Sequence, residues 1–176
     1  MARDNIQVPY GYEMPKSGQG ERGSLWIYDS FEGYTMPQLE KVLRLTEERS
    51  IARAIFYPLH EETVRRMDRH SVAPYYARTD ALRGLLEDSG TDVDWTIEAF
   101  EGKRKKYTPI DTALRFLEEK YEKPHFVYMT DFMANLFAGY DSFGPWIKKV
   151  RLFIAAETGL QPHPKLEAYG NRWERL

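Results

Sequence analysis

The sequence predicts an α/β protein, a three-layer sandwich in which helices cover both faces of a five-stranded, mainly parallel sheet. Two observations predict it. Short apolar runs typical of buried strands alternate along the chain with longer segments whose apolar residues recur at helical spacing. The chain has 176 residues, 42% of them hydrophobic and 30% charged, which suits one domain with a substantial core. Strands that alternate with helices form parallel sheets, because the helix carries the chain back across the sheet.

The five predicted strands are apolar segments bounded by polar or turn-forming residues. Most are nearly continuous apolar runs, as expected of strands that are buried on both faces. The second ends at Pro58, and the third instead alternates apolar and polar residues. The segments are 25–28, 52–57, 93–100, 126–129 and 151–156.

The predicted helices cover 35–49, 61–67, 75–87, 108–121, 132–137 and 146–149. Thr35 and Gln38 have the spacing of a capping box, so the first helix is expected to begin there. Thr108 is the candidate cap of the helix over 108–121, the clearest of the set. Its apolar residues form one stripe, made of Ile110, Ala113, Leu114, Leu117 and Tyr121.

The two ends of the chain differ from this pattern. Residues 1–22 contain glycine and proline with little apolar periodicity, which predicts an irregular arm. The α/β domain is expected over 23–159. The tail, 160–176, has two prolines and mixed polarity, and a short helix is the most that it is expected to hold.

Composition excludes several classes of function. The sequence has no cysteine, which excludes disulfides and thiolate chemistry. The net charge of −2 gives no general attraction to nucleic acid or to an anionic membrane. No apolar run is long enough to cross a bilayer, and the amino terminus has no apolar signal core, so a cytoplasmic location is expected. The four histidines lack metal-ligand spacing, and no structural metal is expected.

The predicted layout is Rossmann-like, and such sheets bind ligands outside the carboxyl ends of their strands, where the winding reverses. The segments that follow the predicted strands at that edge are 29–38, 58–69, 100–111 and 130–146. Candidate site residues are therefore sought in these four segments.

The segment that follows the first strand resembles the signature loop of the nicotinate and nicotinamide mononucleotide adenylyltransferases, in the nucleotidylyltransferase superfamily. It matches that signature at Ser30, Phe31, Thr35 and Leu39. It departs from it at Asp29, Gly33, Pro37 and Gln38. Gln38 replaces a histidine and cannot carry a positive charge, Pro37 removes a backbone donor, and Asp29 adds negative charge beside a phosphate site. The motifs that would bind phosphate are therefore degenerate.

Further segments resemble the same family in the same order. Tyr107 and Thr108 stand in a segment similar to the one that holds the mononucleotide, and Asp131 stands near the Asp that meets a ribose. Trp146 falls where the family has a Trp that stacks on the pyridine ring. The phosphate-binding segment that the family carries after the fifth strand has no counterpart between Glu157 and the end of the chain.

The resemblance implies a role for each matched residue. Thr35 and Gln38 would orient the phosphates during adenylyl transfer, with Mg²⁺ accompanying ATP. The nucleotide would lie against Ser30, Phe31, Tyr107, Thr108, Asp131 and Trp146. His60, after the second strand, and Lys106, in the basic run 103–106, are weaker candidates for contact with a phosphate.

Ordinary structural roles remain open for the same residues. Thr35 and Gln38 are also a helix cap, and Asp131 is a candidate cap. Trp146 is also a candidate for core packing, and Tyr107 and Lys106 are candidates for a solvated surface. Arg78, in the helix where many relatives carry an arginine, is interpreted as an ordinary solvated side chain.

Three functions follow. The first is a diverged nucleotidylyltransferase-like protein that binds a nucleotide or mononucleotide, with weak or no adenylyl transfer. The second is an active mononucleotide adenylyltransferase that makes a dinucleotide from ATP. The third is a non-enzymatic interaction module, because a shared fold does not establish a shared function. A homo-oligomer or a protein partner is compatible with all three.

Overall fold

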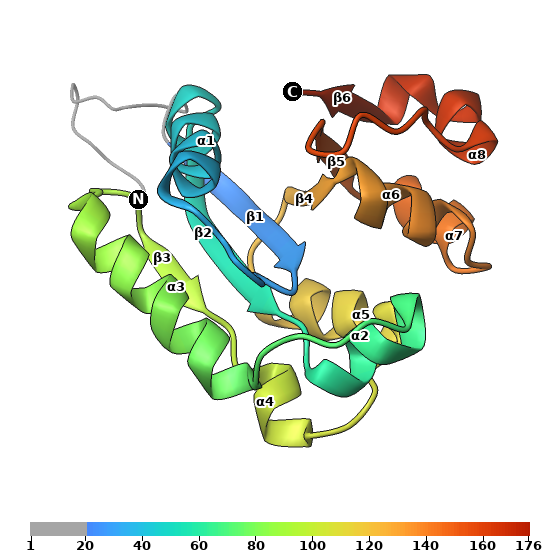
Figure 1. The fold of residues 1–176 in the computed structure, drawn as a ribbon. Coiled ribbons are helices and arrows are strands. Elements are labelled where there is room, and N and C mark those ends of the chain that lie inside the picture. Colours follow the sequence, from blue (N-terminus) through green and yellow to red (C-terminus); the bar gives the residue numbers. More distant parts are fainter. Residues whose placement is uncertain (1–20) are drawn as a thin grey trace, which may run out of the picture.

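The structure, a computed structural model, describes residues 21–176, so the predicted arm lies outside the described residues except for its last two. One six-stranded sheet runs through the molecule in the order β3-β2-β1-β4-β5-β6, and every neighbouring pair is parallel (Figure 1). The strands are β1 (Arg22–Asp29), β2 (Ile51–Pro58), β3 (Trp95–Ile97), β4 (His125–Thr130), β5 (Arg151–Ala155) and β6 (Trp173–Arg175).

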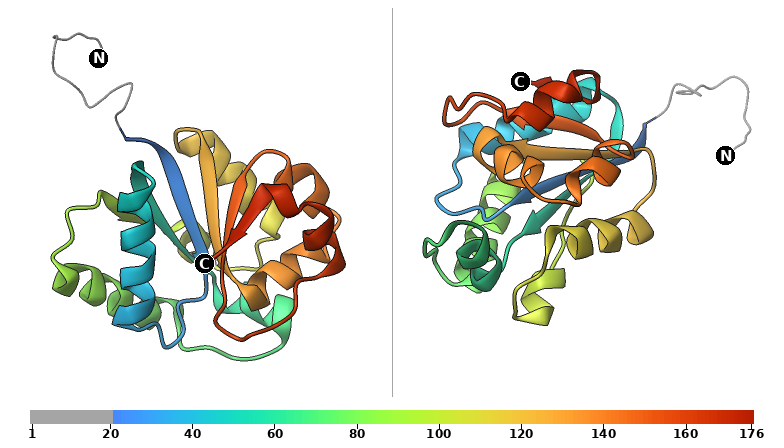
Figure 2. Two further views of the ribbon diagram at one scale, coloured as in Figure 1. Left: turned by 90° about the horizontal axis from the view of Figure 1, so that it is seen from above. Right: turned by 90° about the vertical axis from the view of Figure 1, so that its right-hand side faces the viewer.

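Helices cover both faces of this sheet, as predicted (Figure 2). On one face lie α1 (Met36–Glu48) and α3 (Tyr75–Ser89). The other face is covered by α2 (Glu61–Asp68), α5 (Ile110–Lys120), α6 (Asp131–Ala138), α7 (Phe143–Ile147) and α8 (Pro164–Ala168). The short α4 (Phe100–Arg104) follows β3, and a 3₁₀ turn (Gly170–Arg172) precedes β6.

Alternation along β1 explains why its residues 25–28 are apolar without a break. Leu25 and Ile27 pack under α1 and α3, while Trp26 and Tyr28 pack under the helices of the opposite face. All four side chains are at most 1% exposed. A strand buried on both faces needs apolar residues at every position, which is the pattern that predicted a parallel sheet.

The prediction of five strands is wrong, because the tail adds a sixth. The sequence predicts no more than a short helix in the tail. The tail holds the short helix α8, but it also holds β6. β6 pairs with β5 and Trp173 packs against the core. Polar contacts add to this: Glu174 accepts hydrogen bonds from both Arg49 and Arg151, and the Arg172 guanidinium donates to three carbonyls that precede β5. A strand of three residues that is held in this way carries no apolar periodicity.

Three smaller differences lie around the carboxyl edge. β3 spans three residues of the predicted 93–100, and the segment after it forms α4 instead of a loop. Thr108 does not cap α5, because Pro109 occupies the cap position. The backbone N–H of Thr108 donates instead to the Thr63 hydroxyl at 3.0 Å, and the Thr108 side chain is buried. The predicted apolar stripe of α5 is buried.

None of the helices in residues 21–176 combines the length and the apolar character that a membrane span requires.

Candidate functional site

The winding of the sheet reverses between β1 and β4, which are neighbours at its centre. From β1 the chain proceeds outward through β2 to β3, and from β4 it proceeds through β5 to β6 on the other side. The connections after β1 and β4 therefore leave in opposite directions, and the space between them is where such sheets bind ligands. The structure places Ser30, Phe31 and Asp131 at this edge.

The connection after β1 is folded tightly on itself. The Asp29 carboxylate accepts the N–H of Phe31 at 3.1 Å. Phe31 has a φ of 63°, and its side chain is 3% exposed, packed against Tyr34 and Phe56. Burial raises the pKa of Asp29, although the hydrogen bonds from Phe31 and Ser30 lower it. The ring of Phe31 is thus part of the core, and the Asp29 carboxyl is occupied by the N–H of its own turn.

Thr35 and Gln38 lie together at the start of α1 and form the predicted capping box. The Gln38 amide oxygen accepts the Thr35 N–H at 2.9 Å, and the Thr35 hydroxyl oxygen accepts the Gln38 N–H at 3.4 Å. Each side chain therefore satisfies a backbone donor of the first helical turn, where a bound phosphate would otherwise find free N–H groups.

Asp131 is the first residue of α6, and its carboxylate is 4% exposed and fully occupied by protein donors. It accepts four backbone N–H groups and the Thr158 hydroxyl; the N–H donors are Phe132, Thr158, Gly159 and Leu160. Burial alone would raise the pKa of Asp131, but these hydrogen bonds hold it below its usual value. Asp131 thus anchors the connection after β5 to the start of α6.

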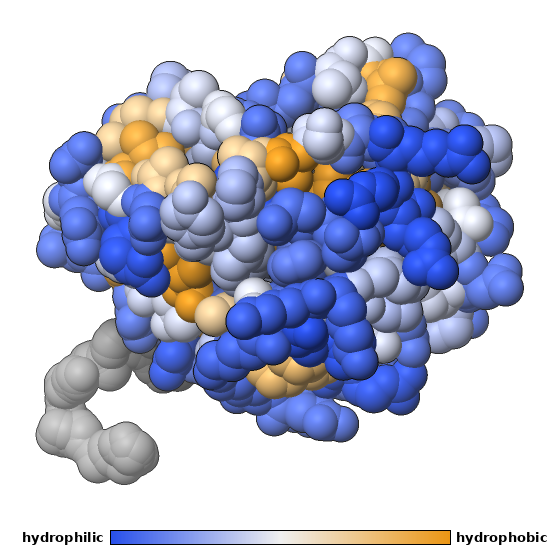
Figure 3. Space-filling model, turned by 60° about the horizontal axis from the view of Figure 1, so that its bottom comes forward, coloured by the Kyte–Doolittle hydropathy of each residue, from blue (hydrophilic) through white to orange (hydrophobic). Residues whose placement is uncertain are grey.

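A cavity of about 230 Å³ opens beside the first turn of α5. Its lining comes from three places in the chain: Met67 on α2, residues 107–111, and the connection between α6 and α7. The lining includes the aromatic side chains Tyr107 and Tyr140 and the carboxylates of Asp111 and Asp141. The side of the molecule formed by α2, α4 and α5 comes forward in Figure 3, where its surface is largely hydrophilic with separate apolar areas.

Trp146 lies next to this cavity rather than in its lining. The indole is 4% exposed and belongs to the core under α5 and α7. Its N–H donates to the Asp111 carboxylate at 2.7 Å, and the Lys149 ammonium lies 4.7 Å from its ring centroid. The hydrogen bonds from Trp146 and Arg115 lower the pKa of Asp111, so the cavity has an ionised carboxylate in its wall.

The two weaker phosphate candidates occupy different environments. His60 precedes α2 and caps it: its Nδ1 accepts the Glu62 N–H at 3.1 Å. Lys106 is exposed and adjoins Tyr107 but does not line the cavity, whereas the imidazole of His60 is engaged by its own helix.

Two cations near the switch point lie beside carboxylates. Lys41 lies 4.0 Å from the Glu157 carboxylate, and the guanidinium of Arg78 lies 3.0 Å from that of Glu61. Within residues 21–176 no group of three His, Asp or Glu side chains is arranged to hold a metal ion. The described residues thus do not fit a metal centre, and no role is assigned to a protein-bound Mg²⁺.

Arg78 is the first residue whose importance the sequence did not indicate. It is 3% exposed, so its interpretation as a solvated side chain is wrong. Its guanidinium donates to the carbonyl oxygens of Ser30, Leu59 and Ala73 at 2.7–2.8 Å. Because these carbonyls belong to the connections after β1, β2 and α2, one side chain fixes three segments of the carboxyl edge. The family resemblance singled out Arg78, but neither periodicity nor composition distinguishes it from the other arginines.

Glu101 on α4 is the second such residue. Its carboxylate is fully buried and accepts the Tyr57 hydroxyl at 2.7 Å, the His60 N–H at 2.8 Å and the Thr63 hydroxyl at 2.8 Å. Burial raises the pKa of Glu101 to about 7. A glutamate in a run of charged residues gives no sign in the sequence that it joins β2, α2 and α4.

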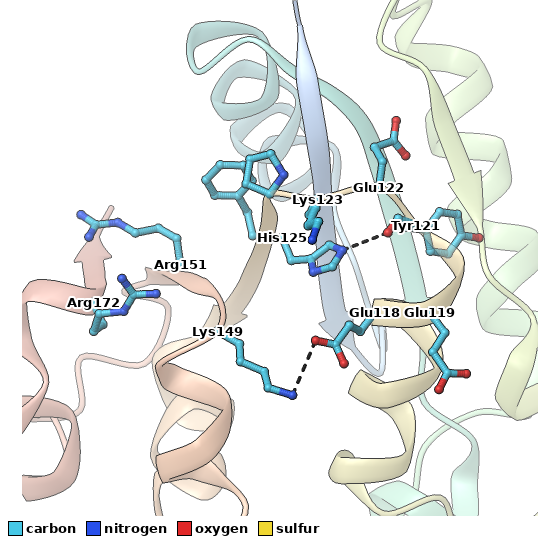
Figure 4. Close-up of a pocket in the computed structure, with 11 residues that line it drawn as sticks. Glu118, Glu119, Tyr121, Glu122, Lys123, His125, Lys149, Arg151 and Arg172 are labelled. Carbon is cyan, nitrogen blue, oxygen red and sulfur yellow. Dashed lines mark hydrogen bonds and ion pairs between the residues drawn. The ribbon is translucent and has the colours of Figure 1, made fainter.

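A larger cavity, of about 980 Å³, lies at the opposite edge of the sheet, where β4 and β5 begin (Figure 4). Arg151, Arg172 and Lys149 lie on one side of it and glutamates of α5 on the other. Their donors are engaged locally: Lys149 pairs with Glu118 at 3.6 Å, Arg151 pairs with Glu174 at 2.9 Å, and Arg172 donates to neighbouring carbonyls. We therefore place the candidate site at the carboxyl edge.

No protein-family model matches the chain, and none of the curated proteins compared with it matches it.

Proposed function

We propose that this chain is a diverged nucleotidylyltransferase-like protein that binds a mononucleotide and performs adenylyl transfer weakly or not at all. The cavity beside the first turn of α5 carries this proposal. Tyr107 and Tyr140 offer aromatic faces, and Asp111 is held ionised. A volume of about 230 Å³ is below the usual range for drug-sized ligands and suits a single ring.

The charge of the cavity determines which form of a ligand ring it would bind. A positively charged ring is attracted by aromatic faces and by carboxylates, so a pyridinium ring suits this lining. Nicotinate carries a carboxylate on that ring, which the exposed Asp141 carboxylate would repel, whereas the charge of Asp111 is paired with Arg115. Nicotinamide mononucleotide is therefore the expected ligand in preference to nicotinate mononucleotide.

The phosphate side of the site supports weak or absent transfer. Adenylyl transfer depends on cations and free N–H donors that stabilise charge on the transferred phosphoryl group. Thr35 and Gln38 bond to each other, and Asp29 adds a carboxylate beside them. The cavity beside α5 contains none of these groups, and binding of a mononucleotide there is thus separable from transfer.

Titration calorimetry with nicotinamide mononucleotide and nicotinate mononucleotide tests the proposal. We expect the nicotinamide form to bind more tightly. Tyr107→Ala should weaken that binding about tenfold, because it removes an aromatic face from the cavity. Tyr76→Ala is the matched control, since Tyr76 is 69% exposed on α3 and does not line the cavity.

Two outcomes would support the other functions. Release of pyrophosphate from ATP and Mg²⁺ in the presence of either mononucleotide, at a rate typical of an enzyme, would favour an active adenylyltransferase. Absence of binding by both mononucleotides would favour an interaction module on a Rossmann-like fold.

A further inference from the structure

Arg66 on α2 lies over the ring of Tyr107. Its guanidinium carbon is 4.3 Å from the ring centroid, within the range of a cation–aromatic contact. The residue is exposed, and among the ion pairs formed within residues 21–176 none includes Arg66. Its neighbour Arg65 differs, because it pairs with Glu62 at 2.5 Å.

Buried hydrogen bonds hold α2, the helix that carries Arg66, against the segment that carries Tyr107. Thr63 stands three residues before Arg66, on the same face of α2. The Thr63 hydroxyl accepts the N–H of Thr108 at 3.0 Å and donates to the buried Glu101 carboxylate. These bonds fasten α2 to the segment that carries Tyr107, so the backbone of Arg66 and the ring on which its guanidinium lies are held close together.

Arg66 lies next to two residues that line the cavity. Tyr107, on which its guanidinium rests, and Met67, the next residue along α2, both line the cavity. Lys106 adds a second exposed cation beside Tyr107. The carboxylates of the lining, Asp111 and Asp141, belong to α5 and to the connection after α6. Carboxylates from those two segments thus line the cavity, and the two cations lie outside its lining, beside Tyr107.

We propose that Arg66 binds the phosphate of a mononucleotide whose ring occupies the cavity lined by Tyr107 and Tyr140. This inference rests on the proposed function. The carboxylates repel a phosphate, which therefore lies towards Arg66 and Lys106. A guanidinium presents parallel N–H donors that match two phosphate oxygens, and it is weakly hydrated, so it suits this role better than an isolated ammonium does.

Titration calorimetry on the full chain tests the inference with two probes that differ only in the phosphate, nicotinamide mononucleotide and nicotinamide riboside. Arg66→Ala should weaken mononucleotide binding about tenfold or more and leave riboside binding unchanged within about twofold. Arg66→Lys should retain part of the affinity, because it keeps the charge and loses the paired donors. Arg65→Ala, on the same helix, should change neither affinity.

The outcomes separate this inference from the proposed function. If wild-type protein binds both probes and Arg66→Ala weakens them equally, or weakens neither, the phosphate role of Arg66 is wrong while the cavity remains a binding site. If the wild type binds neither probe, both the proposed function and this inference are wrong. The melting temperature of Arg66→Ala, compared with that of Arg65→Ala, identifies any loss of affinity that comes from unfolding.

Discussion

The guanidinium of Arg78 donates a hydrogen bond to the carbonyl oxygen of Ser30 at 2.7 Å, across 48 residues of sequence. The bond joins α3 to the connection after β1, the segment that faces the switch point. The same guanidinium also donates to Leu59 and Ala73. The carboxyl edge of the sheet is therefore organised around one buried cation.

Arg78→Met should destabilise the protein by about 3 kcal/mol or more, because it leaves three carbonyl acceptors without their donor. Arg83→Met is the matched control on the same helix, since the Arg83 side chain is 48% exposed. Urea denaturation measures both variants. An equal loss of the free energy of unfolding in the two variants would show that Arg78 stabilises the protein no more than a surface arginine does.

Glu101 gives the stability a dependence on pH. Its pKa is raised by burial to about 7 in the folded protein, against an ordinary value of 4.5. Between these two values the folded protein binds a proton that the unfolded chain has released. The free energy of unfolding should therefore fall as the pH rises through this window, by roughly 3 kcal/mol in all.

Glu101→Gln should remove this dependence, because the amide does not titrate. Its oxygen can still accept the His60 N–H and the Thr63 hydroxyl, and its NH₂ group can donate to the Tyr57 hydroxyl oxygen. Denaturation series from pH 4.5 to 8 on both proteins isolate Glu101 from the other titrating groups. If the free energy of unfolding depended on pH in the same way in both proteins, the raised pKa of Glu101 would be contradicted.

The capping box makes a prediction for the loop that resembles a nucleotide site. Thr35→Ala should cost about 1 kcal/mol, because it removes the acceptor for the Gln38 N–H. Thr35→Ser retains the hydroxyl, so it should lower the free energy of unfolding by at most about 0.3 kcal/mol. Chemical denaturation compares the two. A cost for Thr35→Ala no greater than that for Thr35→Ser would show that the cap contributes nothing.

Trp146 should behave as a core residue that also orders Asp111. Trp146→Ala should cost about 3 kcal/mol or more, because the indole is buried. Trp146→Phe should cost about 1 kcal/mol, since it keeps most of the ring and loses the N–H. It should also raise the pKa of Asp111 towards its ordinary value, because the Trp146 hydrogen bond is the main cause of the lowering.

A carboxyl titration followed by NMR checks that shift. Arg115→Ala is the comparison, because Arg115 is the second donor to Asp111 and lies on the surface of α5. An unchanged Asp111 pKa in Trp146→Phe would mean that the indole N–H does not hold this carboxylate in solution.

Local sequence predicted the elements whose signals are local. The apolar runs found five strands, and Thr35 with Gln38 located the start of α1, because a capping box involves only residues three apart. The mononucleotide-binding function remains a prediction. The resemblance that suggested it lies in side chains such as Tyr107, whose surroundings come from distant segments.

The sequence by itself determined the α/β class, the parallel sheet and the face that α5 buries, since hydrophobic periodicity reports burial within one element. Only the tertiary structure decided that β6 joins the sheet, that Arg78 is buried and that Glu101 has a raised pKa. Each of these depends on segments that are far apart in the chain and come into contact only in the folded protein. Glu101 meets Tyr57, His60 and Thr63 across some 40 residues, and no pattern within one segment can encode that meeting.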